Sequence, residues 1–186
     1  MEAIKKIGLN KISKVILVSL LGTLLLTISA KIKIPFYPVP MTMQTFIVLL
    51  LGIILGSKVG LLTVSLYLFE GIFGLPVFAG TPEKGIGFIY FAGPTMGYLL
   101  GFLIAVYIVG SFKYDKGIIN TFFKLLLSVS FIYILGLIWL GILIGFDKPI
   151  LKLGAQPFLL AEIFKILLLS SLLPTLLKIK KLVKII

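Results

Sequence analysis

The chain has 186 residues, of which 60% are hydrophobic and 13% are charged, and its formal net charge is +12. A water-soluble domain carries about 25% charged residues, so this composition excludes a soluble enzyme, a disordered chain and a secreted disulfide scaffold. The sequence predicts instead an all-α integral membrane protein, because about 20 apolar residues are enough for a helix to cross the hydrocarbon core.

Six apolar stretches follow one another along the chain, and we expect them to form one membrane domain of six transmembrane helices. The predicted spans cover residues 15–30, 42–55, 59–73, 95–109, 118–145 and 158–177. Several are shorter than the usual span, so we expect them to extend into their flanks or to lie where the bilayer is thin. The fifth is long enough to tilt.

The first stretch also has features of a signal peptide, namely a basic start, an apolar core and a small residue at Ala30. Ile28, at position −3 from such a cleavage site, is a poor cleavage signal. We therefore favour an uncleaved first span.

All 18 basic residues are lysines, and apart from Lys165, which lies within the last span, we assign them to the segments that flank or connect the spans. This placement indicates membrane topology and not binding of nucleic acid. With six spans, one side of the membrane carries Lys5, Lys6, Lys11, Lys14, Lys58, Lys113, Lys116, Lys124, Lys178, Lys180, Lys181 and Lys184. The other side carries only Lys31, Lys33, Lys84, Lys148 and Lys152. The positive-inside rule then predicts that both termini are cytoplasmic.

The three loops predicted on the outer side, 31–40, 74–94 and 146–157, are rich in proline and glycine. Long loops with fixed turns tend to carry function, so we expect a binding site on the outer side. The chain has no Cys and no His, which removes thiol and imidazole chemistry and disfavours a membrane enzyme. No cofactor or metal is expected.

The loop from Gly80 to Gly87 has the GxxxxG spacing of a phosphate-binding loop. It lacks the Lys-Ser/Thr pair that must follow, so we reject nucleotide binding there. A glycine-rich loop that lets its backbone approach a ligand remains plausible.

Two charges lie within the last span. Glu162 and Lys165 are three residues apart and share one helix face. They could form a self-neutralising pair near the interface, with Lys165 reaching toward water, or a ligand site in which a carboxylate accepts N–H groups and an ammonium donates. We favour the ligand site, because Pro157 places the pair in the first turns beyond an outer loop. Gln44, just after Pro40, is a further candidate.

Small residues recur at every fourth position in three places. Gly52, Gly56 and Gly60 form one stripe, and Gly93, Gly97 and Gly101 form another. Such spacing lets helices approach closely, and we favour packing within the chain over an oligomer interface. A third stripe consists of Ser19, Thr23 and Thr27. It either packs internally or contacts a partner subunit, and the sequence leaves both open.

Four segments carry distinctive motifs. Residues 38–45 read PVPMTMQT, 71–80 read GIFGLPVFAG, 85–102 contain a glycine loop followed by GPTMGYLLGF, and 157–165 read PFLLAEIFK. In this order they resemble the PVPxTxQT, GxxGLPVFAG, glycine-loop and GPTGGYLxGF, and PFLxGDxxK segments of the biotin transporter substrate-binding proteins, the BioY family. The family supplies the S components of energy-coupling factor transporters. These are six-helix proteins that capture biotin outside a prokaryotic plasma membrane, and a transmembrane coupling subunit and ATPase subunits then drive uptake.

By this resemblance, the biotin pocket is lined by Gln44, Gly80, Thr81, Gly85, Gly87, Tyr98, Glu162 and Lys165. The resemblance also implies that Glu162 and Lys165 hold the ureido ring, and that the loop beside Tyr98 closes over it. Ser19, Thr23 and Thr27 stand where the family has an Ala-rich contact with the coupling subunit. The resemblance implies no ATP site in this chain.

The chain departs from the family pattern at three positions: Ala161 and Met96 each replace a usual Gly, and Glu162 replaces a usual Asp. Two alternatives stay open, an S component for another vitamin and a membrane assembly protein without a small ligand. Leaving a buried charge unpaired costs a few kcal/mol, so we predict that Glu162 and Lys165 pair with each other when biotin is absent.

Overall fold

The computed structural model describes residues 11–35, 37–114 and 117–183, and this part of the chain is predominantly helical. Its elements are α2 (Lys11–Lys31), β1 (Lys33–Ile34), β2 (Met41–Thr42), α3 (Gln44–Ile72), α4 (Gly87–Phe91), α5 (Met96–Ser111), α6 (Ile118–Ile144), α7 (Ile150–Gly154) and α8 (Leu159–Val183). The predicted all-helical class is confirmed. Lys5, Lys6, Lys116 and Lys184 of the topology argument lie outside the described residues.

Helix α3 reverses direction at Gly56, whose backbone has φ 76° and ψ 177°, a conformation that favours glycine. The Gln44 amide donates to the Tyr67 hydroxyl at 2.7 Å although 23 residues separate them. An uninterrupted helix would place them about 34 Å apart along its axis. Residues 44–55 and 57–72 are therefore two antiparallel arms, and they correspond to the second and third predicted stretches.

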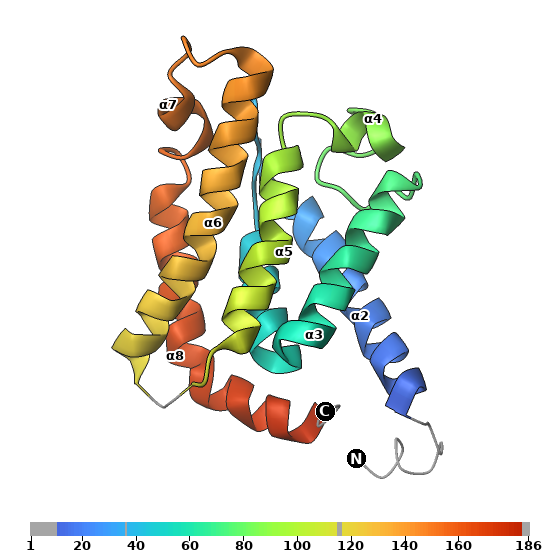
Figure 1. Ribbon diagram of the computed structural model, residues 1–186, viewed down its shortest axis with the longest axis vertical. Coiled ribbons are helices and arrows are strands. Elements are labelled where there is room, and N and C mark those ends of the chain that lie inside the picture. The colour runs from blue at the N-terminus through green and yellow to red at the C-terminus, as the bar shows by residue number, and fades with distance from the viewer. Residues whose placement is uncertain (1–10, 36, 115–116, 184–186) are drawn as a thin grey trace.

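The long helices lie side by side in the order α8, α6, α5, α3 and α2, as Figure 1 shows. α5 packs against α3 on one side and α6 on the other, while α8 contacts both α3 and α6. The connections 73–95 and 145–158 lie at one end of the molecule (Figure 1). The start of α2, the reversal in α3 and the end of α8 lie at the opposite end.

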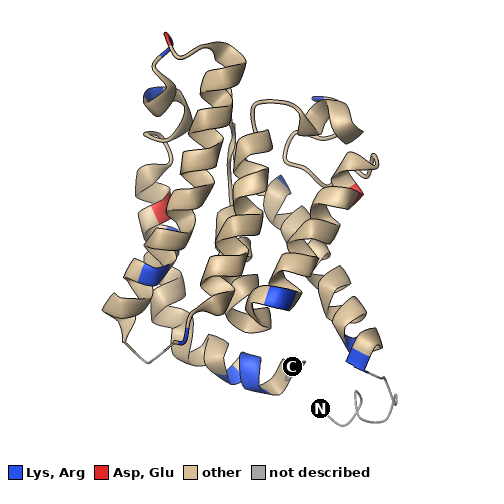
Figure 2. Ribbon diagram, viewed as in Figure 1, with Lys and Arg blue, Asp and Glu red and all other residues tan. Residues whose placement is uncertain are grey.

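Four helices are long and apolar enough to cross a membrane, namely α2, α3, α6 and α8, and α5 is a shorter apolar helix. Helix α8 contains Pro174, and its last turns run across the lower end of the molecule (Figure 1). Lysines gather toward that end, as Figure 2 shows. The number of six crossings and the orientation of the termini stay predictions.

The glycine stripes pack within the chain, as predicted. A β-carbon on Gly60 would lie 2.9 Å from a Val106 methyl group of α5, and one on Gly101 would lie 2.6 Å from the Ile132 Cα of α6. The backbones of α3, α5 and α6 thus approach so closely that only glycine fits at these positions.

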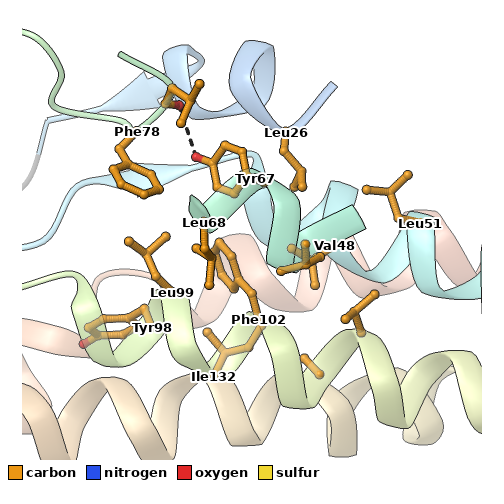
Figure 3. Packing of buried hydrophobic residues seen from close by; sticks show 14 of the residues in the cluster. Leu26, Val48, Leu51, Tyr67, Leu68, Phe78, Tyr98, Leu99, Phe102 and Ile132 are labelled. Carbon is orange, nitrogen blue, oxygen red and sulfur yellow. Dashed lines mark hydrogen bonds between the residues drawn. The ribbon is translucent and has the colours of Figure 1, made fainter. Parts of the chain in front are cut away.

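A buried aromatic cluster connects the loop after α3 to the helices (Figure 3). The Phe78 ring meets the Tyr67 ring edge-on, with centroids 5.4 Å apart, and stacks on the Tyr90 ring at the same distance. Gly71 leaves room for Phe78, because a β-carbon there would collide with its ring. The loop is thereby packed against the interior.

We predict that Gly56→Ala destabilises the protein by about 1–3 kcal/mol, because alanine rarely adopts the positive φ of the reversal. The apparent melting temperature in detergent measures this. Leu62→Ala, on an exposed position of the same helix, is the control and should cause a much smaller shift. An unchanged melting temperature for Gly56→Ala would contradict the reversal as an essential feature.

Candidate ligand-binding site

A cavity of about 60 Å³, here called the central cavity, lies among the segment 39–45, the loop after α3, and helices α5, α6 and α8. Most of its wall area is apolar, and its polar groups come from threonines, tyrosines, Gln44 and Glu162. It is lined by Val39, Pro40, Met41, Thr42, Gln44, Thr45, Phe78, Ala79, Tyr90, Thr95, Tyr98, Leu99, Phe102, Ile132, Tyr133, Phe158 and Glu162. An apolar enclosure with a small number of placed polar groups is typical of a small-molecule site.

Lys165 forms three short hydrogen bonds in the interior. Its ammonium donates to Glu162 Oε1 at 2.6 Å, to the Thr42 carbonyl at 2.7 Å and to Thr45 Oγ1 at 3.1 Å. These acceptors match the three protons of the ammonium group. The predicted pairing of Glu162 with Lys165 is confirmed. Each residue is only 5% exposed, so Lys165 does not reach toward water.

The two oxygens of the Glu162 carboxylate differ in their hydrogen bonding. Oε1 accepts hydrogen bonds from Lys165 and from Thr45 Oγ1, the latter at 2.8 Å. Oε2 is buried and accepts no hydrogen bond of standard geometry within the described part of the chain, although the Tyr133 hydroxyl lies near the carboxylate. Buried polar atoms are nearly always paired, so an orphaned carboxylate oxygen beside a cavity indicates where the N–H group of a ligand would bind.

Gln44 begins α3 and connects three segments. Its amide nitrogen donates to the Tyr67 hydroxyl, and that hydroxyl donates to the Val77 carbonyl at 3.1 Å, the bond drawn in Figure 3. The Gln44 amide oxygen accepts from Thr42 Oγ1 at 3.2 Å. Gln44 therefore fixes the relative positions of the two α3 arms and of the loop after them.

Tyr98 occupies a slot between two glycines. Its hydroxyl donates to the Gly154 carbonyl at 2.8 Å, and its ring meets the Tyr133 ring edge-on, with centroids 6.0 Å apart. A β-carbon on Gly136 would collide with the Tyr98 ring, and one on Gly154 would lie 2.5 Å from its hydroxyl. The predicted site residue Tyr98 thus lines the central cavity in a fixed orientation.

The four predicted loop residues, Gly80, Thr81, Gly85 and Gly87, do not line the central cavity. The Gly80 N–H donates to the Tyr90 hydroxyl at 3.0 Å, and Thr81 Oγ1 donates to the Phe78 carbonyl at 2.8 Å. Gly85 and Gly87 have φ of 96° and 67°, which shape the turn. These residues support the wall formed by Phe78 and Ala79, and their contact with a ligand stays a prediction.

Tyr90 serves both the loop and the cavity. It lies in α4, stacks on Phe78 and lines the central cavity. Burial raises the pKa of its hydroxyl, so the group stays neutral and accepts the Gly80 N–H. The cavity wall is consequently held without an added charge.

Ser19 and Thr23 face α3. Ser19 Oγ accepts from Thr63 Oγ1 at 3.2 Å, and Thr23 Oγ1 lies 3.0 Å from Glu70 Oε1. Both residues are buried, whereas Thr27, which donates to the Thr23 carbonyl, is half-buried. The structure favours internal packing for Ser19 and Thr23, and contact of this stripe with a partner stays untested.

Several residues at the site were not predicted from the sequence. Thr42 and Thr45 lie within the segment 38–45 that carries the resemblance, so their hydroxyls could have been noticed there. Tyr67 lies in no recognised motif, and its sequence position is that of an ordinary tyrosine near the end of a predicted span. Gly136 and Gly154 gave no signal, because their role depends on Tyr98, which is 38 and 56 residues away in sequence.

Comparison with known proteins assigns the family. The BioY family model matches residues 3–182. The chain belongs to the BioY family. It is 37% identical over 141 residues to the probable biotin transporter BioY of Pyrococcus horikoshii, covering 76% of this chain and 82% of that protein. It is 36% identical over 148 residues to the biotin transporter BioY of Thermotoga maritima, covering 77% and 84%.

A solved structure of the S-component for biotin from an ECF-type ABC transporter has a similar fold, with a TM-score of 0.74. It is 26% identical in sequence, and the match covers 89% of this chain and 91% of that one. The BioY match includes the whole central cavity and the Glu162–Lys165 pair. The four segments quoted above therefore belong to a family relationship that covers nearly the full chain.

We predict that Lys165→Met destabilises the protein by about 3–5 kcal/mol, because it leaves a buried carboxylate without its counter-ion. The double substitution Glu162→Gln/Lys165→Met should recover most of this loss, since it also removes the carboxylate. Melting temperatures in detergent measure both variants. A double variant less stable than Lys165→Met would contradict the pairing as the cause.

Proposed function

We propose that this protein is the biotin-capturing S component of an energy-coupling factor transporter in a prokaryotic plasma membrane. Membership in the BioY family and the likeness to the biotin S-component support this function. The observation that carries it is the orphaned Glu162 Oε2 at the wall of an apolar cavity, next to a buried ammonium. Such a pair can accept the N–H of a urea and donate to its carbonyl.

Biotin offers groups that complement this site. Its ureido N–H would donate to Glu162 Oε2, while its ureido oxygen would replace one acceptor of the Lys165 ammonium. Its thioether ring and its aliphatic chain are apolar and suit walls such as Phe102 and Ile132. The ureido end of the ligand would thus find partners that the interior already contains.

Binding would require the central cavity to expand. Its volume is about 60 Å³, and sites for small molecules usually measure about 300–1,000 Å³. The wall formed by Phe78 and Ala79 belongs to a loop, whereas the opposite wall belongs to packed helices. Movement of the loop is therefore the simplest way to admit the ligand.

The proposed orientation places the start of α2 and the end of α8 in the cytoplasm. The concentration of lysines at that end supports it through the positive-inside rule (Figure 2). The loops near the central cavity would then face outward, where biotin is captured. A transmembrane coupling subunit and separate ATPase subunits would supply the energy for uptake.

Equilibrium binding of labelled biotin to the purified chain in detergent tests the function. We expect saturable binding that unlabelled biotin displaces and that riboflavin and thiamine do not. Absence of biotin binding to well-folded protein would overturn the proposal. Displacement by either competitor would favour an S component for another vitamin.

We predict that Glu162→Gln and Lys165→Met each weaken biotin binding at least about 30-fold, because removal of one partner from a buried charge pair costs about 2 kcal/mol or more. The same titration measures both. Asp147→Asn and Lys148→Met are matched controls at an exposed ion pair, with side chains 71% and 57% exposed. Unchanged binding in both site variants would contradict the assigned roles.

A further inference from the structure

Lys31, at the end of α2, and Lys33, at the start of β1, both donate hydrogen bonds to the backbone of the loop after α3. The Lys31 ammonium donates to the Phe78 carbonyl at 2.9 Å, to the Thr81 carbonyl at 2.8 Å and to Thr81 Oγ1 at 3.2 Å. The Lys33 ammonium donates to the Ala79 carbonyl at 3.0 Å. Three carbonyls within four consecutive residues thus accept from two ammonium groups.

These contacts concern the movable wall of the central cavity, since Phe78 and Ala79 both line it. The preceding carbonyl, that of Val77, accepts from the Tyr67 hydroxyl. The segment 77–81 is therefore held mainly by side chains from other elements. Loss of the two ammonium groups would leave the Ala79 and Thr81 carbonyls to be satisfied by water, whereas the Phe78 carbonyl would still accept from the Thr81 N–H and hydroxyl. The wall would then be held less firmly.

The same lysines are connected to the opposite side of the cavity. In the two-stranded sheet Lys33 is the register partner of Thr42, whose carbonyl accepts from Lys165. The hairpin of β1 and β2 thus has Lys33 bound to the wall on one side and Thr42 bound to α8 on the other. Movement of the wall is linked through a short, hydrogen-bonded path to the Glu162–Lys165 pair.

We propose that Lys31 and Lys33 are positioning residues that clamp the wall segment 77–81 over the central cavity and thereby set how long the ligand stays bound. This inference rests on the proposed function, which it deepens. Hydrogen bonds from a charged donor are about twice as strong as neutral ones, and here several converge on one short segment. Neither lysine lines the central cavity, so the clamp acts through the wall.

A direct role for these lysines would be to bind the carboxylate of biotin. The observed geometry favours the clamp, because all three acceptors of Lys31 belong to the wall segment and Lys31 does not line the central cavity. Lys33 is similarly engaged, by the Ala79 carbonyl and by Glu83 at 3.7 Å. A ligand carboxylate would have to displace these partners. The two roles make different predictions for a ligand that lacks the carboxylate charge.

Hydrogen exchange of the loop amides tests the clamp without any ligand. The Gly80 amide is bonded to Tyr90, and the Thr81 and Lys84 amides are bonded to the Phe78 and Gly80 carbonyls. We expect Lys31→Met to speed exchange of these amides about tenfold, and Lys33→Met less, because local opening becomes easier. Lys152→Met removes a charge on α7 and is the matched control. Unchanged exchange in both lysine variants would overturn the clamp.

Rates of biotin dissociation test the effect of the clamp on ligand binding. We expect Lys31→Met to raise the biotin dissociation rate about tenfold, since most effects of such changes appear in that rate. Biotin amide, which lacks the carboxylate charge, should lose affinity by the same factor as biotin. Lys31→Arg should restore much of the residence time, because a guanidinium also donates to several carbonyls. A loss confined to biotin would overturn the clamp in favour of direct carboxylate binding.

The wild-type protein separates the two proposals. If it fails to bind biotin, the proposed function is overturned, and the exchange experiment still decides whether the lysines hold the wall. If it binds biotin and the variants release it at the wild-type rate, the clamp is overturned and the function stands. A merely destabilised variant would show less binding-competent protein with an unchanged dissociation rate.

Discussion

A single buried ammonium joins the parts of the structure that surround the central cavity. Lys165 on α8 binds the Thr42 carbonyl on β2, the Thr45 hydroxyl on α3 and the Glu162 carboxylate one turn away. Removing a charge from water is expensive, so this arrangement is tolerable only when every proton has an acceptor. The hairpin, the first arm of α3 and the start of α8 are therefore constrained to meet at one point.

The close approach of the helices determines which residues meet at the site. Gly56 reverses α3, so that Gln44 in one arm reaches Tyr67 in the other, and Tyr67 then holds the Val77 carbonyl. Glycines at the α5–α6 contact bring these helices close enough for Tyr98 to reach Gly154. Small residues thus determine where the polar groups lie, although they take no part in the chemistry.

Features that depend on local spacing could be predicted from the sequence. Apolar runs located the helices, the four-residue glycine spacing indicated close packing, and the three-residue separation of Glu162 and Lys165 placed them on one face. Features that join distant segments could not. Gly154 receives the Tyr98 hydroxyl across 56 residues, and Lys31 meets Thr81 across 50, and no periodicity marks either pair. The resemblance predicts that Gly80, Thr81, Gly85 and Gly87 line the biotin pocket, whereas the wall of the central cavity is formed by their neighbours Phe78 and Ala79.

The unequal hydrogen bonding of the two Glu162 oxygens reconciles two demands on one carboxylate. One oxygen of the Glu162 carboxylate must neutralise Lys165, while a ligand site needs the other oxygen to face the cavity as an acceptor. A carboxylate held symmetrically by its counter-ion would have both oxygens occupied and nothing to offer a ligand N–H. Here Thr45 and Lys165 both bind Oε1, which leaves Oε2 as an acceptor in a dry, apolar enclosure. The free energy lost by leaving that oxygen unpaired would be regained when a donor arrives, so in the proposed function the internal pair and the recognition of a urea depend on the same asymmetry.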